Sequence, residues 1–355
     1  MFGSTIRIGT INSRQPWRPL RAGNLSSLMY PNFVFSLTLG LFPYKSNPTG
    51  YVFTKMRFVW SMITQLVYVV LLAFALYDIN VNLNNSTVEV IDLNAFMISE
   101  GLMILVMHGL AYQRFHLLEK LGKLTRMLSE QDFENMAKFV HTKDIFGIIF
   151  LILHLPNCIV GLNQATLSCL TILYVLLVYL ALDMTYVNCV YVLRACFVKI
   201  NENLKQLNEH KKPLLASVSS QRGRSFLLLV KLKHYEELHQ ETSDAVQYLN
   251  KAFLFRIIVA TIVTFTVVTF NLYFAILFHS TGVKQYKFKR VFFFPHIEAM
   301  TFYLGKFAMM IMMCESAKKK AQEICTTVHE ILSKCTDEKV RHEVIDQVFA
   351  ASVKR

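Results

Sequence analysis

Six apolar runs, each close to the length that a lipid bilayer requires, constrain this chain more than any other feature. A helix rises about 1.5 Å per residue and needs roughly 17 to 25 apolar residues to cross a hydrocarbon core of about 30 Å. Backbone groups in lipid must bond within their own segment, so each run is predicted to be a helix. The six predicted spans are residues 58–77, 95–112, 145–161, 167–193, 257–278 and 299–314.

The composition supports a membrane protein. Hydrophobic residues make up 54% of the chain and the mean hydropathy is +0.38, which exceeds what the core of a soluble protein of 355 residues needs. Soluble helices also keep a polar face at a spacing of about 3.6 residues, and residues 257–278 have almost none. The predicted fold class is therefore all-α, a polytopic membrane helical bundle.

Lysine and arginine are concentrated on one side of the predicted bundle. Of the 37 basic residues, 32 fall in the segments 1–57, 113–144, 194–256 and 315–355, and four fall in the loops of the other side. Because cytoplasmic loops carry the basic excess, both termini are predicted to be cytoplasmic. The net charge of +13 then faces an anionic inner leaflet, and nucleic acid is not a predicted partner.

The cytoplasmic parts are predicted to be an N-terminal segment (1–57), a helical loop (194–256) and a tail (315–355). Apolar residues recur at helical spacing through Leu204 and Leu207, so the helix of span four is expected to continue into the cytoplasm. The same spacing before residue 257 predicts a helix that runs on into span five.

One region resembles a known family. Within residues 232–278, His239, Asp244, Asn250 and the triplet 272–274 (Leu-Tyr-Phe) stand at positions that resemble the signature of insect gustatory receptors. The segment FVFSLTLGLFPYK at 33–45 is similar to the one before the first span in that family. The segment 315–349 is similar to the link after its sixth span. The resemblance covers nearly the whole chain.

The resemblance implies a subunit of a ligand-gated, non-selective cation channel in the plasma membrane of a chemosensory neuron. It implies a small tastant as ligand and a homo- or hetero-tetramer as the assembly. The family has a seventh, pore-lining span with Thr-Tyr, five apolar residues and Gln-Phe, whereas this sequence ends at Arg355 without that pattern. We therefore expect that the chain does not conduct when it is expressed alone.

Polar residues inside the predicted spans indicate where a ligand would bind, because such residues are costly in lipid and usually face the bundle interior or a cavity. Those in the outer halves are expected to line an outward-opening cavity of aromatic and polar side chains, typical of a small-molecule site. A sugar and a planar bitter compound fit this description equally. The predicted ligand-binding residues are Glu100, His154, Asn157, Tyr174, Asn271, Tyr273, His296, Glu298 and Thr301.

Several of these polar residues have a structural alternative. Glu100 could instead pair with His154 or His296 between helices, and His296 and Glu298 could be solvated at the membrane edge. Asp183 lies deeper and is expected to brace the helices. Lys306 is expected to extend toward the interface or to pair with a carboxylate.

Other classes of protein agree less well with the sequence. A G-protein-coupled receptor requires an external N-terminus, which the charge distribution opposes. A secondary transporter, kept as an alternative, would have paired spans broken by glycine or proline, and Pro156 is the one proline well inside a span. The sequence has no convincing nucleophile–base pair and no cysteine–histidine cluster at metal spacing, so no enzyme, cofactor or metal site is predicted. The remaining alternative is a non-conducting modifier subunit of intact receptors.

Overall fold

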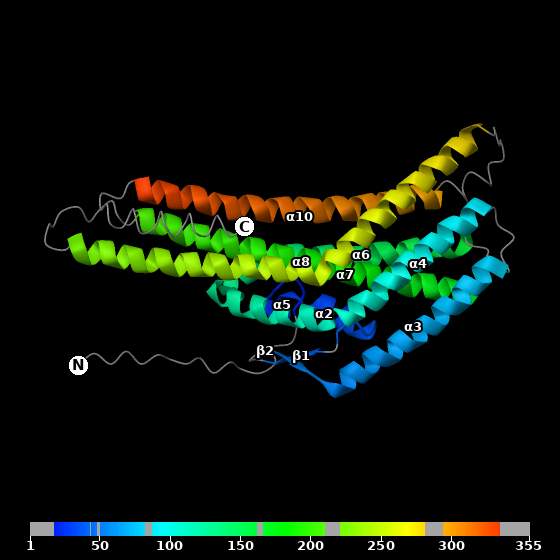
Figure 1. Cartoon of the computed structure of the whole chain (residues 1–355), viewed down its shortest axis with the longest axis horizontal. Helices are drawn as coiled ribbons and strands as arrows, with labels where there is room; N and C mark the ends of the chain where they lie inside the picture. The colour runs from blue at the N-terminus through cyan, green and yellow to red at the C-terminus, as the bar shows by residue number, and fades with distance from the viewer. Residues whose placement is uncertain are drawn as a thin grey trace.

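The computed structural model describes residues 18–42, 44–47, 50–81, 87–161, 166–209, 221–280 and 294–333, which are mostly helical (Figure 1). The N-terminal elements are α1 (Leu25–Leu28), α2 (Tyr30–Thr38), β1 (Tyr44–Asn47) and β2 (Gly50–Phe53). The remaining elements are α3 (Lys55–Val81), α4 (Thr87–Gly109), α5 (Ala111–Leu124), the 3₁₀ turn η1 (Thr125–Met127), α6 (Glu130–Gly161), α7 (Thr166–Glu209), α8 (Gln221–Ser280) and α10 (Phe294–Ser333). The predicted all-α class is confirmed. One small antiparallel sheet, β1–β2, was not anticipated.

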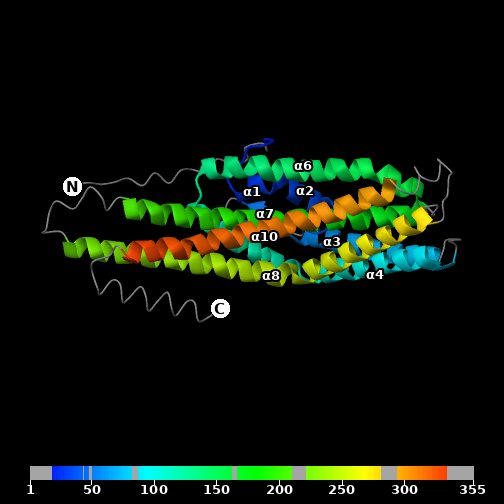
Figure 2. The ribbon, with the colours of Figure 1, turned by 90° about the horizontal axis from the view of Figure 1, so that it is seen from above.

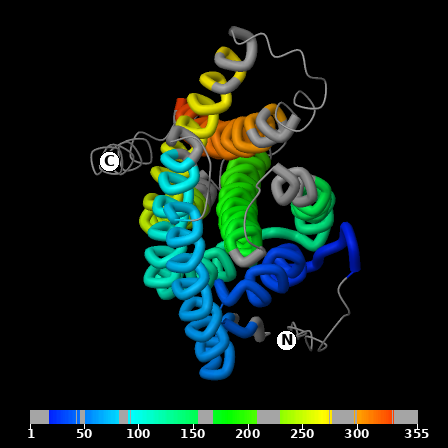
Figure 3. The backbone as a smooth tube through the Cα atoms, turned by 90° about the vertical axis from the view of Figure 1, so that its right-hand side faces the viewer, coloured from blue at the N-terminus to red at the C-terminus, as the bar shows by residue number. Residues whose placement is uncertain are grey.

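Helix α7 lies at the centre of the bundle, and the other helices surround it (Figure 3). In its most apolar stretch, 72% of the residues are buried. A helix that is apolar on all sides is stable in a protein core or in lipid, and here the neighbouring helices provide the core. Figure 2 shows α6 along one side of α7, with α4 and α8 on the opposite side.

Helix α3 lies at the edge of the bundle, and only 17% of the residues in its most apolar stretch are buried. Its outward face carries large apolar side chains that are about half exposed or more, among them Leu66, Val70 and Phe74. Exposed apolar surface on this scale marks contact with a partner or a membrane. Together with the length of the helix, it indicates a face that contacts lipid.

Three helices are long and apolar enough to cross a bilayer within the described ranges: Lys55–Val81, Ser168–Leu207 and Leu229–Tyr273. The bent pair Leu93–Gly109 and Ala111–Met127 makes a fourth if the two helices form one span. The predicted spans 145–161 and 299–314 fall within α6 and α10. The division into six spans stays a prediction.

The bend between α4 and α5 is 59°. It falls at Leu110, inside the stretch predicted as span two, where one helix was expected to continue to residue 112. Arg114 Nη2 donates a hydrogen bond of 2.9 Å to the carbonyl of Met107. A cation that bonds the last carbonyls of a helix stabilises its C-terminus, so Arg114 supports the end of α4 at the bend.

Helices α7, α8 and α10 continue together beyond the rest of the bundle (Figure 1). Phe197 and Leu204 of α7 pack there with Leu232 of α8 and Ile324 and Ile331 of α10. The predicted continuation of the fourth helix through Leu204 is confirmed. Helix α8 is one helix of 60 residues that runs into the predicted fifth span, as expected.

The N-terminal elements pack against α6 and α7 through specific hydrogen bonds. His141 of α6 accepts a bond of 3.0 Å at Nδ1 from the Leu20 amide, and its Nε2 lies 3.0 Å from the Leu28 carbonyl. This pattern requires the proton on Nε2. Leu20 has φ of 60°, a strained conformation for a residue with a side chain. His141 therefore holds the strained turn before α1 against the bundle.

Candidate functional site

Four ionisable side chains meet inside the bundle, one from each of four helices. They are Glu100 of α4, Asp183 of α7, Arg256 of α8 and Lys306 of α10, and all are buried, with exposed fractions of 0%, 1%, 1% and 7%. We call them the charge cluster. Two acids and two bases balance in formal charge, which reduces the large cost of placing charges in a medium of low dielectric constant.

Asp183 is the centre of the charge cluster. Its Oδ1 accepts a hydrogen bond of 2.7 Å from Arg256 Nη2. Its Oδ2 lies 2.9 Å from Lys306 Nζ, an ion pair without the angles of a hydrogen bond. Asp183 therefore joins α7 to both α8 and α10. This agrees with the bracing role that was expected from its depth in span four. Lys306 pairs with a carboxylate, which was one of its two expected roles.

Tyr179 completes this group from one turn earlier on α7. The Arg256 guanidinium carbon lies 3.4 Å from the centroid of its ring, and Lys306 Nζ lies 3.0 Å from the same centroid. A cation over an aromatic face gains on the order of 2 kcal/mol when water is excluded. The ring and the carboxylate of Asp183 therefore share the stabilisation of the same two cations.

Glu100 differs from the other members because neither of its carboxylate oxygens has a hydrogen-bond partner among the described residues. It interacts electrostatically with Arg256 and Lys306. The hydroxyl of Tyr68 on α3 is buried and also interacts electrostatically with Glu100. It too has no hydrogen-bond partner among the residues that the structure describes. Buried polar atoms are nearly always bonded, to protein or to ordered water. The Glu100 carboxylate therefore has hydrogen-bonding capacity that the described protein groups do not use.

A second buried polar group lies between α6 and α7. Lys143 pairs with Asp144, and Asn188 Nδ2 donates a hydrogen bond of 3.0 Å to Asp144 Oδ2. Lys143 also interacts electrostatically with Asp183. Polar groups therefore continue from the charge cluster across α7 to α6.

Two of the predicted ligand-binding residues, Glu100 and Tyr174, share a neighbour, Tyr68. Tyr68 interacts electrostatically with both, and the rings of Tyr68 and Tyr174 are 5.2 Å apart. The Tyr174 hydroxyl donates a hydrogen bond of 3.0 Å to the Leu39 carbonyl. The structure thus brings these two predicted residues together around Tyr68.

Three other predicted residues lie on α8 and α10, Asn271 and Tyr273 on α8 and Thr301 on α10. Asn271 Nδ2 donates to the Val267 carbonyl at 2.6 Å, and Thr301 Oγ1 donates to the Ile297 carbonyl at 2.8 Å. Tyr273 is 45% exposed. His154 and Asn157 belong to α6, and His296 and Glu298 to α10, but these four side chains are outside the described part of the structure.

Sequence reasoning missed Arg256, Tyr179 and Tyr68. Arg256 directly precedes the predicted fifth span, where a basic residue is equally expected at the cytoplasmic interface. Tyr179 could have been found, because it lies four residues before Asp183 and such a pair shares one face of a helix. Tyr68 carries no comparable signal. In the described segments, no group of three or more His, Cys, Asp or Glu side chains could hold a metal ion.

The fold and the charge cluster together define a multi-pass helical membrane protein with a polar centre. A family model described as 7tm Chemosensory receptor matches residues 29–347, and the chain belongs to this family of chemosensory receptors. The search of curated proteins found no match.

Proposed function

We propose that this chain is a gustatory receptor subunit that binds a small tastant and contributes to a ligand-gated, non-selective cation channel in the plasma membrane. Membership of the chemosensory receptor family supports a receptor that binds a ligand. The channel mechanism, the tastant and a homo- or hetero-tetrameric assembly are the finer parts of the proposal, which follow from the likeness to gustatory receptors.

The observation that carries the proposal is the unsatisfied carboxylate of Glu100 beside two buried cations. A ligand hydroxyl or amine that bonds Glu100 would change the field at Arg256 and Lys306, which hold α8 and α10 to Asp183. Ligand binding and helix position would then be linked by electrostatics. A conformational change requires such a differential interaction between two states.

The arrangement of helix ends supports cytoplasmic termini. The C-terminal ends of α3 and α8 and the N-terminal ends of α4 and α10 lie at one end of the molecule (Figure 1). The loops that these ends flank contain only four of the 37 basic residues. By the positive-inside rule this end is proposed to be external.

The proposed ligand is a sugar or a planar bitter compound, bound from the external side toward Glu100 and Tyr174. His154, Asn157, Asn271, Tyr273, His296, Glu298 and Thr301 remain proposed contacts of this site. The alternatives are a secondary transporter and a modifier subunit that changes the response of intact receptors.

Ion substitution in cells that make this chain, alone or with other receptor subunits of the family, tests the proposal. A panel of sugars and plant alkaloids is applied during patch-clamp recording. The proposal expects an inward current with at least one compound, and loss of that current when N-methyl-D-glucamine replaces external sodium and potassium. Compound uptake without current would support a transporter. A modifier subunit would be supported if the other subunits conduct without this chain and its co-expression changes only their ligand sensitivity. Correct surface expression with neither response contradicts all three.

A further inference from the structure

The base of α3 and the β1–β2 hairpin form one surface that is both apolar and basic. Its side chains are exposed. The exposed apolar members are Val52 (47%), Phe53 (50%), Met56 (79%), Phe58 (44%) and Trp60 (48%), and the exposed basic members are Lys45 and Lys55. We call these seven residues the α3 base.

The register of the hairpin accounts for Lys45 and Val52 of the α3 base. Lys45 is paired directly with Val52, and residues that are directly opposite in a sheet share a face. Tyr44 and Tyr51 are buried, at 5% and 8%. Alternation along each strand therefore turns the two tyrosines inward and leaves Lys45 and Val52 on the outer face.

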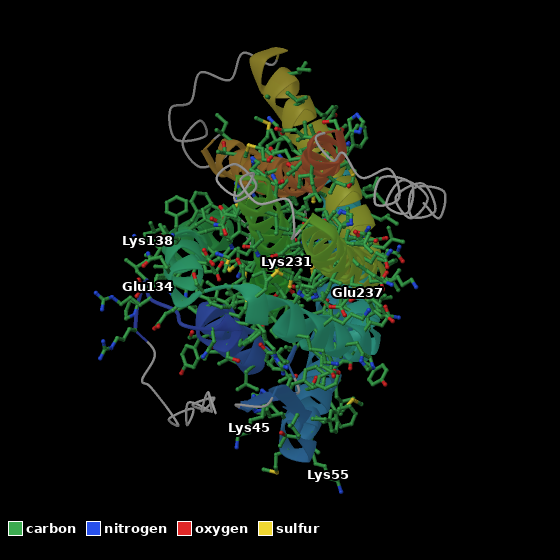
Figure 4. The ribbon with its side chains drawn as sticks, turned by 90° about the vertical axis from the view of Figure 1, so that its left-hand side faces the viewer. Lys45, Lys55, Glu134, Lys138, Lys231 and Glu237 are labelled. Carbon is green, nitrogen blue, oxygen red and sulfur yellow. The ribbon has the colours of Figure 1, made fainter. Side chains whose placement is uncertain are left out.

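The two lysines carry charge without an acidic partner. Neither Lys45 nor Lys55 forms an ion pair with any described residue, and residues 1–57 contain no Asp or Glu at all. Figure 4 shows both side chains directed away from the bundle on the same side of the molecule. The two ammonium groups are therefore accessible to an anion from outside the protein.

Trp60 is held in place between the basic end and the apolar face of α3. Its indole Nε1 donates a hydrogen bond of 3.2 Å to the Leu37 carbonyl, while the ring stays half exposed. Tryptophan is enriched where the hydrocarbon of a bilayer meets the headgroups. Beyond Trp60, α3 continues with exposed Leu66, Val70 and Phe74, so Trp60 marks the level at which the helix enters lipid.

We propose that the α3 base binds an anionic phospholipid. The phosphate lies against Lys45 and Lys55, and the acyl chains cover the apolar members and the adjoining face of α3. A phospholipid supplies both parts of this surface at once, an anion and an extended apolar tail, whereas an acidic protein segment would leave Met56 and Phe58 uncovered. With the N-terminus inside, the lipid belongs to the cytoplasmic leaflet, which is rich in anionic headgroups.

Quenching of Trp60 fluorescence by brominated lipids measures this binding directly. The protein carries Trp17→Phe, so that Trp60 is the single tryptophan, and is reconstituted in nanodiscs of phosphatidylcholine. A fixed small fraction of lipid is replaced by brominated phosphatidylserine or, in parallel, by brominated phosphatidylcholine. We expect stronger quenching by brominated phosphatidylserine, corresponding to a preference of about fivefold for each lysine engaged.

Two paired variants make the test specific. Lys45→Gln with Lys55→Gln is expected to remove the preference and leave equal quenching by both lipids. Lys138→Gln with Lys231→Gln, which changes two exposed lysines away from the α3 base (Figure 4), is expected to retain it. Equal quenching by both lipids in the parent protein overturns the proposal, as does a preference that survives loss of Lys45 and Lys55. Absence of quenching by either lipid overturns it too, because Trp60 would then lie outside the bilayer.

Discussion

Asp183 accepts a hydrogen bond of 2.7 Å from Arg256, which lies 73 residues further along the chain on another helix. The second oxygen of the same carboxylate is 2.9 Å from Lys306 on a third helix. One buried acid thus holds two buried bases, and its removal leaves both without their closest counter-charge. A single substitution in the charge cluster is for this reason expected to be strongly destabilising.

Asp183→Asn is expected to destabilise the protein by about 3 to 5 kcal/mol, the usual cost when one partner of a buried ion pair is removed. The apparent melting temperature in detergent, followed by fluorescence-detected size exclusion, measures the loss. Lys306→Met is expected to cost less, because Arg256 still pairs with Asp183. Lys318→Met, at an exposed lysine of the same helix, is the control. Equal melting of wild type and Asp183→Asn would show that the cluster does not contribute to stability.

Gly101→Val is expected to destabilise the contact between α3 and α4. A Cβ atom at Gly101 would lie 2.6 Å from Leu72 Cδ2 and 3.3 Å from the Tyr68 hydroxyl. Overpacking of this kind costs about 1 to 3 kcal/mol. Gly305→Val is the matched control, because no other described residue outside its own helical turn lies within 4 Å of a Cβ built there. Addition of Leu72→Ala should recover part of the loss. Identical melting of both valine variants contradicts the close contact.

The N-terminus of α6 is expected to lose stability in acid. Burial works against ionisation of Asp132, but the amide and hydroxyl of Ser129 and the Lys199 ammonium, 3.1 Å away, together hold the pKa of Asp132 below its usual value. A lowered folded-state pKa stabilises the protein above the unfolded-state pKa, and this contribution is lost as the pH falls through the folded-state value.

The difference in apparent stability between wild type and Asp132→Asn measures this contribution. It is expected to be on the order of 1 kcal/mol at pH 7 and to decrease as the pH falls below about 4. A difference that does not change between pH 7 and pH 3 would mean that the Asp132 carboxylate is not the stabilising species.

His141→Ala is expected to release the strained turn that precedes α1. Both ring nitrogens of His141 contact the backbone of that segment, at Leu20 and Leu28. Trypsin should then cleave after Arg21 several times faster than in wild type, because proteolysis requires local opening; Arg18 precedes Pro19 and is not a tryptic site. His116→Ala, on the exposed face of α5, should leave the rate unchanged. Equal cleavage in both variants would show that other contacts hold the turn.

Much of the fold could be predicted from hydrophobic patterning. The apolar runs place the helices, and the spacing through Leu204 extends the fourth one correctly. The β1–β2 hairpin was missed because it packs on distant partners, as where the Tyr44 ring lies 4.7 Å from that of Phe115 on α5, a contact that short-range patterns do not contain. The bend at Leu110 was missed because Gly109, directly before it, lies in an apolar run that was interpreted as one continuous span. Arg114 bonds the Met107 carbonyl across the bend, a contact that the local sequence does not indicate.

The candidate site was predicted less completely. Glu100, Asp183 and Lys306 are conspicuous because charge is rare inside apolar runs. Arg256 is not conspicuous, since a basic residue beside a span has an ordinary explanation at the membrane interface. Only packing shows that this guanidinium turns inward to Asp183. The pairing of helices decides which charges meet, and one sequence contains no direct record of that pairing.

The most direct test of the proposed site is the dose-response curve of Glu100→Gln, measured with a compound that activates the wild type. Glutamine keeps the shape of the side chain and removes its charge, so the field at Arg256 and Lys306 changes with little change in packing. Glu119→Gln, at an exposed residue of α5, is the control. We predict that Glu100→Gln requires at least about tenfold more ligand for a half-maximal response, equivalent to about 1.4 kcal/mol, with surface expression unchanged. Superimposable curves for Glu100→Gln and wild type, at equal surface expression, would contradict the account.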